Sequence, residues 1–330
     1  MAVGGDTVVT FDEWVKRMDK SNVKTIIEIA AASNLMLKTA MVGPGNEVDG
    51  NTTTVRTRYP SGTWTSAYEG VASESSSTKE VWNAAGYLEG YSVISKRYVH
   101  RSPDRKAARM QEERAFIIGY SEEIEDTFFH GDRNLNPKEF LGLDQRYALI
   151  GGETGGQIVD GLGTDAADNT DIWFVGWGAG NASLFFGANG KGGLEIDDKG
   201  MVPWDLDGNG LHQECYVSHY EWNVGLKVED YRCCSRVANI DVSTLLGGTP
   251  QSIVPLMIDA WYKIPTSIMQ SARMAIYCNT TVLAALQKEA RSFGQTNLTL
   301  EDWEGRKQTH FMGIPIFRSD KIVNTGARII

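Results

Sequence analysis

The chain has 330 residues, of which 42% are hydrophobic and 22% charged, an ordinary globular composition that allows one large or two ordinary domains. Its net charge of -10 argues against a protein that wraps nucleic acid directly, because duplex binding depends on Lys and Arg neutralising phosphates. No apolar run approaches the roughly 20 residues that cross a bilayer, and residues 1–10 lack the regions of a signal peptide, so we expect a cytoplasmic protein. Four cysteines without disulfide-like spacing agree with a reducing compartment.

Two helical segments are expected at the start of the chain. Residues 10–13 (TFDE) form a capping-box pattern, and Trp14 and Met18 follow at helical spacing. Residues 26–42 form a second helical stretch, which ends near a Gly-Pro-Gly break. Together these segments predict an N-terminal arm over residues 1–45.

A period-two pattern begins after residue 50 and predicts a hairpin. Apolar and aromatic residues alternate with Arg56 and Arg58, as in a strand with two different faces. Residues 70–78 are too rich in serine to pack, so we expect them to form a mobile tip. The whole segment, residues 46–100, is therefore predicted to be a projecting hairpin.

The return strand of this hairpin is expected over residues 81–98, where Gly86 and Gly90 suggest bulges or kinks. The large aromatic side chains of the hairpin include Trp64, Tyr68 and Trp82. A two-stranded ribbon is only marginally stable alone and cannot bury such rings on itself. The rings therefore pack either on the body of the same chain or on a neighbouring chain. We favour the neighbour, because large exposed apolar surface marks an interface.

The clearest helix in the sequence begins with Ser102 as its N-cap and Pro103 at its first helical position, and it ends at Gly131. At 1.5 Å per residue it would span about 40 Å. Its apolar residues form a narrow stripe that is predicted to face the core, namely Met110, Ile117, Ile124 and Phe128.

The order of charges along this helix opposes the helix dipole. Basic residues gather near its start, at residues 105–109, whereas residues 122–126 include Glu122, Glu123 and two further acidic residues. Each misplaced charge costs up to roughly 1 kcal/mol near a helix end, and less when exposed. One interpretation is a solvated surface with weak charge effects. The sharper hypothesis is that Glu122 and Glu123 meet opposite charges on neighbouring subunits.

The second half of the chain mixes strands and helices. Residues 171–178 form an apolar strand after a glycine-rich loop. Residues 213–224 and 225–240, separated by a glycine, are expected to be a long antiparallel pair. Helices are expected after Pro250 and after an N-cap at Asn279, and strands close the chain.

Possible metal and catalytic motifs are incomplete. Residues 205–210 (DLDGNG) repeat the first half of a calcium loop, but Tyr216 occupies the position that needs Glu, and a hairpin turn is favoured. Zinc-type ligands also occur, namely His212, Cys215, His219, Cys233 and Cys234. Their spacing matches no known pattern, and strand alternation would put His212 and Cys215 on opposite faces. No nucleophile or phosphate-loop motif is complete, so we expect no enzyme activity, no cofactor and no metal.

Four segments occur in an order that is more specific than any one of them. They are residues 53–57 (TTVRT) with Trp64 downstream, residues 168–178 (DNTDIWFVGWG), residues 225–243, which contain GLKVEDYR and RVANIDVS, and residues 277–282 (YCNTTV). In this order they resemble the major capsid proteins of short-tailed double-stranded DNA phages, in the group of the epsilon15 and Bordetella phage coat proteins.

The resemblance implies an α+β protein with the Hong Kong 97 (HK97) capsid fold. That fold has an N-terminal arm, an extended β-hairpin loop (the E-loop), a long spine helix, and peripheral (P) and axial (A) domains. The arm would occupy residues 1–45 and the extended loop residues 46–100. The spine helix and the start of the peripheral domain would occupy residues 101–155. Residues 156–330 would hold peripheral strands intertwined with the axial domain.

The resemblance also implies a structural protein that self-assembles as pentamers and hexamers into an icosahedral shell around the phage genome, without sequence-specific DNA binding. An acidic inner surface would keep DNA from adhering to the wall. The expected partners are other copies of the chain, a decoration or cement protein, a scaffold and a portal, with no membrane. The shell would belong to the virion and assemble in the host bacterial cytoplasm. Candidate inter-subunit contacts are Arg56, Arg58, Trp64, Tyr68, Trp82, Glu122 and Glu123.

Two other functions are weighed against this one. An encapsulin-like nanocompartment shell protein shares the fold but encloses enzymes instead of DNA, so the packaged contents distinguish the two. A hydrolase or nucleotide-binding enzyme with an unrecognised site would be a monomer or small oligomer with measurable turnover.

Overall fold

The computed structural model describes residues 34–101, 105–164, 167–190, 192–205, 210, 212–247, 252–293, 298–303 and 306–330. The helix expected at residues 10–18 lies outside these residues, as do the helix start at Ser102 and Pro103, most of the 205–210 turn and Pro250. The described part mixes helices with a large sheet, in agreement with the predicted α+β class.

The helices and 3-10 turns are α3 (Leu35–Thr39), α4 (Lys96–Arg101), α5 (Arg105–His130), α6 (Leu143–Arg146), η1 (Gly155–Gln157), η2 (Tyr231–Cys233), α7 (Val242–Leu246), α8 (Val254–Lys263), α9 (Thr266–Ser271) and α10 (Thr280–Phe293). The strands are β1 (Val42–Pro44), β2 (Gly50–Arg58), β3 (Ser77–Ser95), β4 (Ile158–Asp160), β5 (Asn169–Trp177), β6 (Ala182–Phe186), β7 (Gly193–Trp204), β8 (Gln213–Val228), β9 (Cys234–Asp241), β10 (Arg273–Cys278), β11 (Leu298–Trp303), β12 (Arg306–Phe311) and β13 (Ile314–Arg318).

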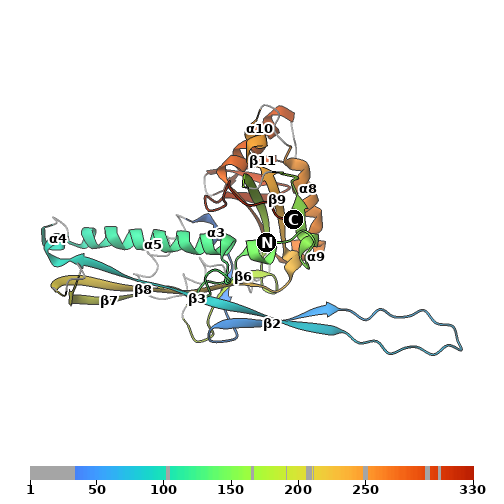
Figure 1. Ribbon diagram of the computed structural model, residues 1–330, viewed down its shortest axis with the longest axis horizontal. Coiled ribbons are helices and arrows are strands. Elements are labelled where there is room, and N and C mark those ends of the chain that lie inside the picture. Colours follow the sequence, from blue (N-terminus) through green and yellow to red (C-terminus); the bar gives the residue numbers. More distant parts are fainter. Residues whose placement is uncertain are drawn as a thin grey trace, which may run out of the picture.

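The strands form a hydrogen-bonded path in the order β11-β12-β13-β10-β5-β6-β8-β3-β2, while β9 pairs with β5 and β4, β7 with β8, and β1 with β6. Figure 1 shows that β3, β7 and β8 run along the length of α5, and that β9, β11, α8 and α10 form a more compact body near one end of that helix. The hairpin of β2 and β3 projects beyond the body, away from α4.

The helix α5 confirms the long helix predicted to end at Gly131, and it packs along the sheet. The Phe116 ring stacks on Tyr220 of β8 with ring centroids 5.1 Å apart, and Ile117 and Ile124 are buried. Met110 was predicted to lie on the same buried stripe but is exposed. Toward its N-terminal end α5 meets the sheet through Arg109 instead, whose guanidinium lies 5.1 Å from the Tyr216 ring centroid.

The glycines of β3 allow close packing and do not form the predicted bulges. The pairing of β3 with β8 runs without a register shift past both Gly86 and Gly90. A Cβ atom on Gly90 would lie 2.2 Å from the Tyr120 hydroxyl oxygen, and one on Gly86 would lie 3.0 Å from the Lys138 carbonyl oxygen. The absence of a side chain therefore lets α5 and the segment after it approach the strand.

The predicted antiparallel pair over residues 213–240 is wrong. β8 continues through Gly225 and pairs with β3, β6 and β7, whereas β9 pairs with β5 and β4. Gly225 lies within this continuous strand, and it is a glycine there because the Phe185 ring would lie 2.6 Å from a Cβ atom. The chain turns later, where the Asp230 carboxylate accepts from the Arg232 backbone N–H at 3.0 Å.

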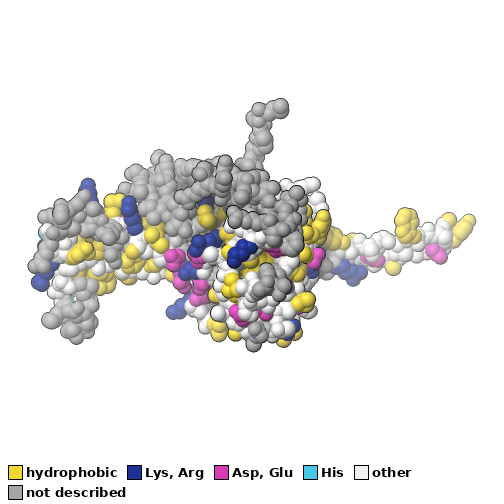
Figure 2. All heavy atoms as spheres, turned by 90° about the horizontal axis from the view of Figure 1, so that it is seen from above, with side chains coloured by type: hydrophobic (Ala, Val, Ile, Leu, Met, Phe, Trp, Pro, Cys, Tyr) yellow, Lys and Arg dark blue, Asp and Glu magenta, His cyan; other side chains and the backbone are white. Residues whose placement is uncertain are grey.

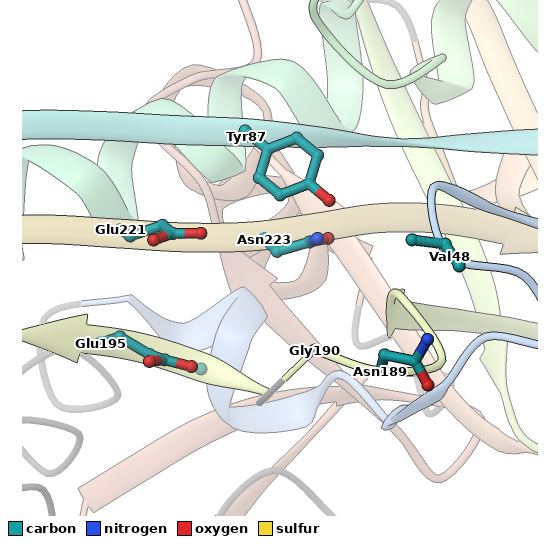
Figure 3. Close-up of a pocket in the computed structure, with 8 residues that line it drawn as sticks. Val48, Tyr87, Asn189, Gly190, Glu195, Glu221 and Asn223 are labelled. Atoms are coloured by element: carbon teal, nitrogen blue, oxygen red, sulfur yellow. The ribbon is translucent and has the colours of Figure 1, made fainter.

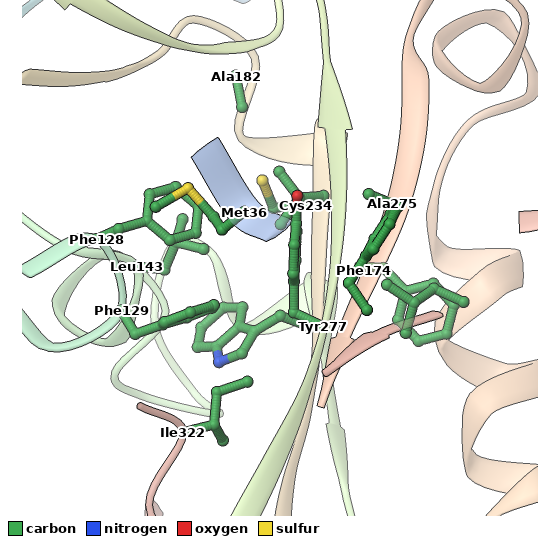
Figure 4. Packing of buried hydrophobic residues seen from close by; sticks show 14 of the residues in the cluster. Met36, Phe128, Phe129, Leu143, Phe174, Ala182, Cys234, Ala275, Tyr277 and Ile322 are labelled. Carbon is green, nitrogen blue, oxygen red and sulfur yellow. The ribbon is translucent and has the colours of Figure 1, made fainter. Parts of the chain in front are cut away.

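The first described residues, which form α3, are anchored in the core. The Asn34 side chain accepts from the Met36 backbone N–H at 2.9 Å and donates to the Ser121 carbonyl of α5 at 2.8 Å, which satisfies the start of α3. The helix ends at Thr39, earlier than the predicted end near residue 42. Figure 4 shows Met36 packed among Phe128, Phe129, Leu143 and Tyr277, so α3 closes one side of the core.

A cluster of ionisable groups joins the C-terminal end of α5 to the body. Arg236 on β9 is only 5% exposed. Its Nη2 lies 2.7 Å from Asp171 Oδ2 and 3.1 Å from Asp144 Oδ1. Asp144 also contacts His130, whose Nε2 lies 2.9 Å from the Lys321 carbonyl oxygen. This cluster connects α5, α6, β5, β9 and the C-terminal segment. No local pattern in the sequence revealed the cluster.

The stability of the protein is expected to fall above neutral pH because of His130. Burial alone would lower the pKa of His130, but the hydrogen bond and charge of Asp144 and the Lys321 carbonyl raise this pKa from 6.5 to about 8. The folded state holds the proton of His130 more tightly than the unfolded state does. The contribution of His130 to the free energy of unfolding is therefore complete below about pH 6.5 and is lost as pH rises through about 8. The shift corresponds to about 2 kcal/mol.

The test of this prediction is urea unfolding of the wild-type chain and of His130→Gln at about pH 6 and about pH 9. We expect the wild-type midpoint to fall more between these values than the midpoint of the variant. An identical fall in both proteins would mean that His130 does not carry this pH dependence.

Candidate functional site: the projecting hairpin and the spine helix

A hairpin built from β2 and β3 projects from the body (Figures 1 and 2). Its strands pair from Gly50 to Arg58, with a register shift between Arg56 and Arg58, and Arg58 lies opposite Ser77. Residues 59–76 then connect the strands without helix or strand structure. The connection is longer than the predicted tip at residues 70–78, because Pro60 cannot donate a ladder hydrogen bond and ends the pairing early.

Two aromatic side chains in this connection are entirely free of the body. Trp64 and Tyr68 are 101% and 102% exposed, relative to the reference state of each residue type. The connection is held by local contacts such as the Ser61 backbone N–H donating to Glu74 Oε2 at 2.6 Å. Large rings in full contact with water are unfavourable and mark a surface that another molecule covers.

Trp82 differs from the other two rings because it packs on its own chain. Its Nε1 donates to Glu47 Oε2 at 3.0 Å, and the Arg133 guanidinium lies 5.3 Å from its ring centroid. The side chain remains about half exposed. Trp82 therefore packs on its own chain with part of its ring, and the exposed part leaves a contact with a neighbouring chain as a prediction.

The two arginines of β2 are exposed near the end of the paired strands. The Arg56 guanidinium lies 5.8 Å from the ring centroid of Tyr59, which is itself exposed. Neither Arg56 nor Arg58 forms an ion pair with a described residue. Their charges are available for another molecule.

The acidic residues at the C-terminal half of α5 have different surroundings. Glu122 Oε2 pairs with Lys321 Nζ at 3.3 Å, while Glu123 is exposed and forms no side-chain hydrogen bond with a described residue. Near the other end of the helix, Arg109 pairs with Asp198 at 2.7 Å. Residues of the same chain thus partly balance the charges that oppose the helix dipole. Lys321 and Asp198 lie far from α5 in the sequence, so local sequence patterns could not reveal these pairs.

Reversing Glu122 and Glu123 to lysine tests whether these charges also meet neighbouring subunits. We expect the double variant to unfold within about 1 kcal/mol of the wild type, because both sites are exposed, and to form no particles. The measurement is sedimentation of the expressed protein, with Asp259→Lys on α8 as an exposed control. Normal particles from the double variant would contradict the hypothesis.

The surroundings of Trp64 and Trp82 predict that their removal has different effects on the stability of the protomer. Trp64→Ala is expected to leave the free energy of unfolding of the unassembled protomer within about 0.5 kcal/mol of wild type. Trp82→Ala is expected to lower it by about 1–2 kcal/mol, because a hydrogen bond and a cation–π contact disappear. Denaturant unfolding of unassembled protomers measures both, and equal destabilisation by the two changes would contradict this division.

Within the described residues, no group of three or more His, Cys, Asp or Glu side chains is placed to hold a metal ion. None of the described helices is long and apolar enough to cross a bilayer. The four cysteines are buried free thiols. The distinctive chemistry of the described surface therefore lies in its exposed rings and unpaired arginines.

Comparison with known proteins identifies the family of this chain. The family model of major capsid protein GP7 matches residues 18–330. The chain belongs to this family. The capsid protein also resembles the solved structure of bacteriophage epsilon15, with 27% sequence identity, a TM-score of 0.69 and 88% of each chain covered. It shares its fold with the capsid of bacteriophage JBD30, at 10% identity and a TM-score of 0.50, over 93% of this chain and 97% of that chain. A search of curated proteins found no significant match.

These likenesses establish the fold and the broad role of the capsid protein. The fold is HK97-like, with the mixed helix and strand arrangement of phage capsid subunits, as the sequence predicted. The capsid protein is a structural shell component that associates with itself. Neither the hydrolase nor the nanocompartment alternative is favoured.

Proposed function

We propose that the capsid protein assembles as pentamers and hexamers into an icosahedral shell that encloses a double-stranded DNA genome. The observation that carries this proposal is a projecting hairpin with fully exposed Trp64 and Tyr68 in a chain of the major capsid protein family. Such a hairpin is stable when it lies on a neighbouring subunit. The shell forms in the bacterial cytoplasm and becomes part of the virion, in the group of the epsilon15 and Bordetella phage coat proteins.

The division of labour along the chain follows the resemblance described above. Residues 1–45 act as the N-terminal arm and residues 46–100 as the extended loop. Residues 101–155 provide the spine helix and the start of the peripheral domain. The remaining residues build peripheral strands and an axial domain. The long α5 and the two-stranded projection support the second and third assignments.

Subunit contacts run through the hairpin and the spine helix. Trp64, Tyr68 and the open face of Trp82 lie on a neighbour, and Arg56 and Arg58 meet acidic groups there. Glu122 and Glu123 supply further contacts along α5. A scaffold, a portal and a decoration protein complete the assembly, and the role is purely structural, with no catalysis and no cofactor.

The contents of the particles test this proposal. Particles purified from phage-producing cells are expected to protect double-stranded DNA from added nuclease, with this chain as their main protein. Particles that hold protein cargo and no DNA would identify a nanocompartment instead and overturn the genome-enclosing role. Disrupted particles treated in the same way are the control, since their DNA must be degraded.

A further inference from the structure

Two edge strands of the sheet differ in how well they are protected. Among the described strands, β7 pairs only with β8, and β2 only with β3. β7 carries Lys199 within a register shift and Pro203 near its end, and such features keep other chains from pairing with an edge. β2 contains no Lys or Pro, its register shift comes only after Arg56, and residues 52–55 (TTTV) favour a strand. The sequence of β2 therefore suits a strand that accepts another strand.

The first half of the outer edge of β2 is closed by its own chain. The Thr52 backbone N–H donates to Asn46 Oδ1 at 2.8 Å, and the Thr52 carbonyl accepts from Asn46 Nδ2 at 2.7 Å. The Gly50 carbonyl accepts from the Glu47 backbone N–H at 3.2 Å. Just before the strand, Val48 lines a small cavity of about 200 Å³ in the body (Figure 3). The start of β2 is therefore held by the body and has no room for a partner.

The second half of this edge is open. Alternate residues of an antiparallel strand turn their backbone N–H and C=O groups to the same side. Those of Thr52 point away from β3, so those of Thr54 and Arg56 do the same. Neither Thr54 nor Arg56 has a backbone hydrogen bond to a described residue on that side, and both residues are exposed. We call these backbone groups of Thr54 and Arg56 the open edge.

The charges beside the open edge restrict which strand can pair with it. The Arg56 side chain is exposed beside this edge, and the register shift places Arg58 on the other face of the hairpin. Two β2 edges that paired with each other would bring their arginines together, and like charges across a ladder are destabilising. The open edge therefore fits an extended segment without basic residues.

The connection at the end of the hairpin is such a segment. Residues 59–76 form no helix or strand and are exposed, and their only charged residues are Glu69 and Glu74. In the protomer the connection runs onward from the paired strands, away from the open edge of its own hairpin (Figure 1). It can therefore reach such an edge on another copy, where its acidic residues complement Arg56.

We propose that the open edge of β2 is a strand-addition site for the hairpin connection, residues 59–76, of a second copy of this chain. The inference rests on the proposed function, in which hairpins lie on neighbouring subunits, and it names the groups that receive them. Backbone hydrogen bonds hold the added segment, and side-chain charges set its orientation. The contact also places Trp64 and Tyr68 against the neighbour.

Proline at Thr54 tests the strand addition. Thr54→Pro removes an N–H that points away from β3, and proline is tolerated at such edge positions. The unassembled protomer is therefore expected to melt within about 2 °C of wild type. The particle yield, measured by sedimentation velocity and negative-stain microscopy, is expected to fall at least about tenfold, because every contact loses a ladder donor. Thr54→Val keeps the N–H and is the control that should assemble normally.

Hydrogen exchange of the wild-type chain tests the same site without a substitution. The amides of Thr54 and Arg56 are expected to exchange at least about tenfold more slowly in particles than in unassembled protomers, because the added strand accepts their protons. The amides of Thr53 and Val55, which point toward β3, serve as the internal reference. Equal exchange of the Thr54 and Arg56 amides in particles and protomers would overturn the inference.

Photo-crosslinking identifies the segment that is added. A photo-crosslinking residue in place of Ser73 is introduced into particles assembled from a mixture of 15N-labelled and unlabelled chains. Crosslinked peptides that join one labelled and one unlabelled chain are expected to contain residues 50–58. Crosslinks confined to another segment, or to another protein, would overturn the assignment of the connection to this edge.

The outcomes separate this contact from the proposed function. Wild-type shells together with full assembly of Thr54→Pro would overturn the strand addition and leave the shell-forming role intact. A wild-type chain that never assembles would contradict the proposed function and the strand addition together.

Discussion

Replacing Arg236 with leucine is expected to lower the free energy of unfolding by about 3–5 kcal/mol, because the change removes one partner of a buried ion cluster. Asp171 and Asp144 would lose the guanidinium that lies 2.7 Å and 3.1 Å from them. The Tyr147 carbonyl would lose a donor at 2.8 Å, and the Trp173 ring would lose the cation 4.8 Å from its centroid. Urea unfolding of the unassembled protomer measures the loss.

Arg232→Leu is the matched control for this experiment. Arg232 pairs with Asp230 at 2.8 Å, but the Arg232 side chain is 47% exposed, so its loss is expected to change the free energy of unfolding by about 0.5 kcal/mol or less. Similar effects of the two changes would mean that burial does not decide the strength of the cluster around Arg236.

Removing the end of the hairpin is expected to abolish shells while leaving the protomer folded. Residues 59–76 can be replaced by Asn-Gly, which forms a two-residue turn and suits the pairing of Arg58 with Ser77. The removed residues include Trp64 and Tyr68, which do not pack on the body. The protomer is therefore expected to keep its unfolding midpoint, and electron microscopy is expected to show no closed particles.

A second variant separates the role of the rings from the role of length. Substituting glycine and serine for every residue of 59–76 keeps the length and removes the aromatic side chains. If the rings carry the contact, this variant also fails to form shells. Normal shells from the shortened hairpin would contradict the idea that its end holds neighbouring subunits together.

Local patterns predicted the elements whose geometry depends on nearby residues. The hairpin followed from the period-two pattern around Arg56 and Arg58, and α5 from its apolar stripe and its stop at Gly131. The N-cap at Asn279 is confirmed by its side chain, which accepts from the Val282 backbone N–H at 2.9 Å. Caps and alternation act over a few residues, so they are readable in a single sequence.

Features that depend on distant residues were missed or wrong. Gly225 has the local character of a turn, but it lies within β8, where its lack of a side chain leaves room for the distant Phe185 ring. The ion cluster joins Arg236 to His130 through Asp144, and no spacing rule connects such residues. In the candidate site, Trp64 is free of its own chain and its contact with a neighbour stays a prediction, whereas the contacts of Trp82 with the body depend on tertiary packing.

Self-assembly of the purified chain is the most direct measure of the central claim, that this protein builds a shell through its hairpin. The protein is expressed alone and studied by negative-stain electron microscopy together with sedimentation. We expect closed icosahedral particles, or sheets, tubes and rings of five or six subunits if a scaffold is required. A stable monomer at every concentration, even with scaffold added, would contradict the claim.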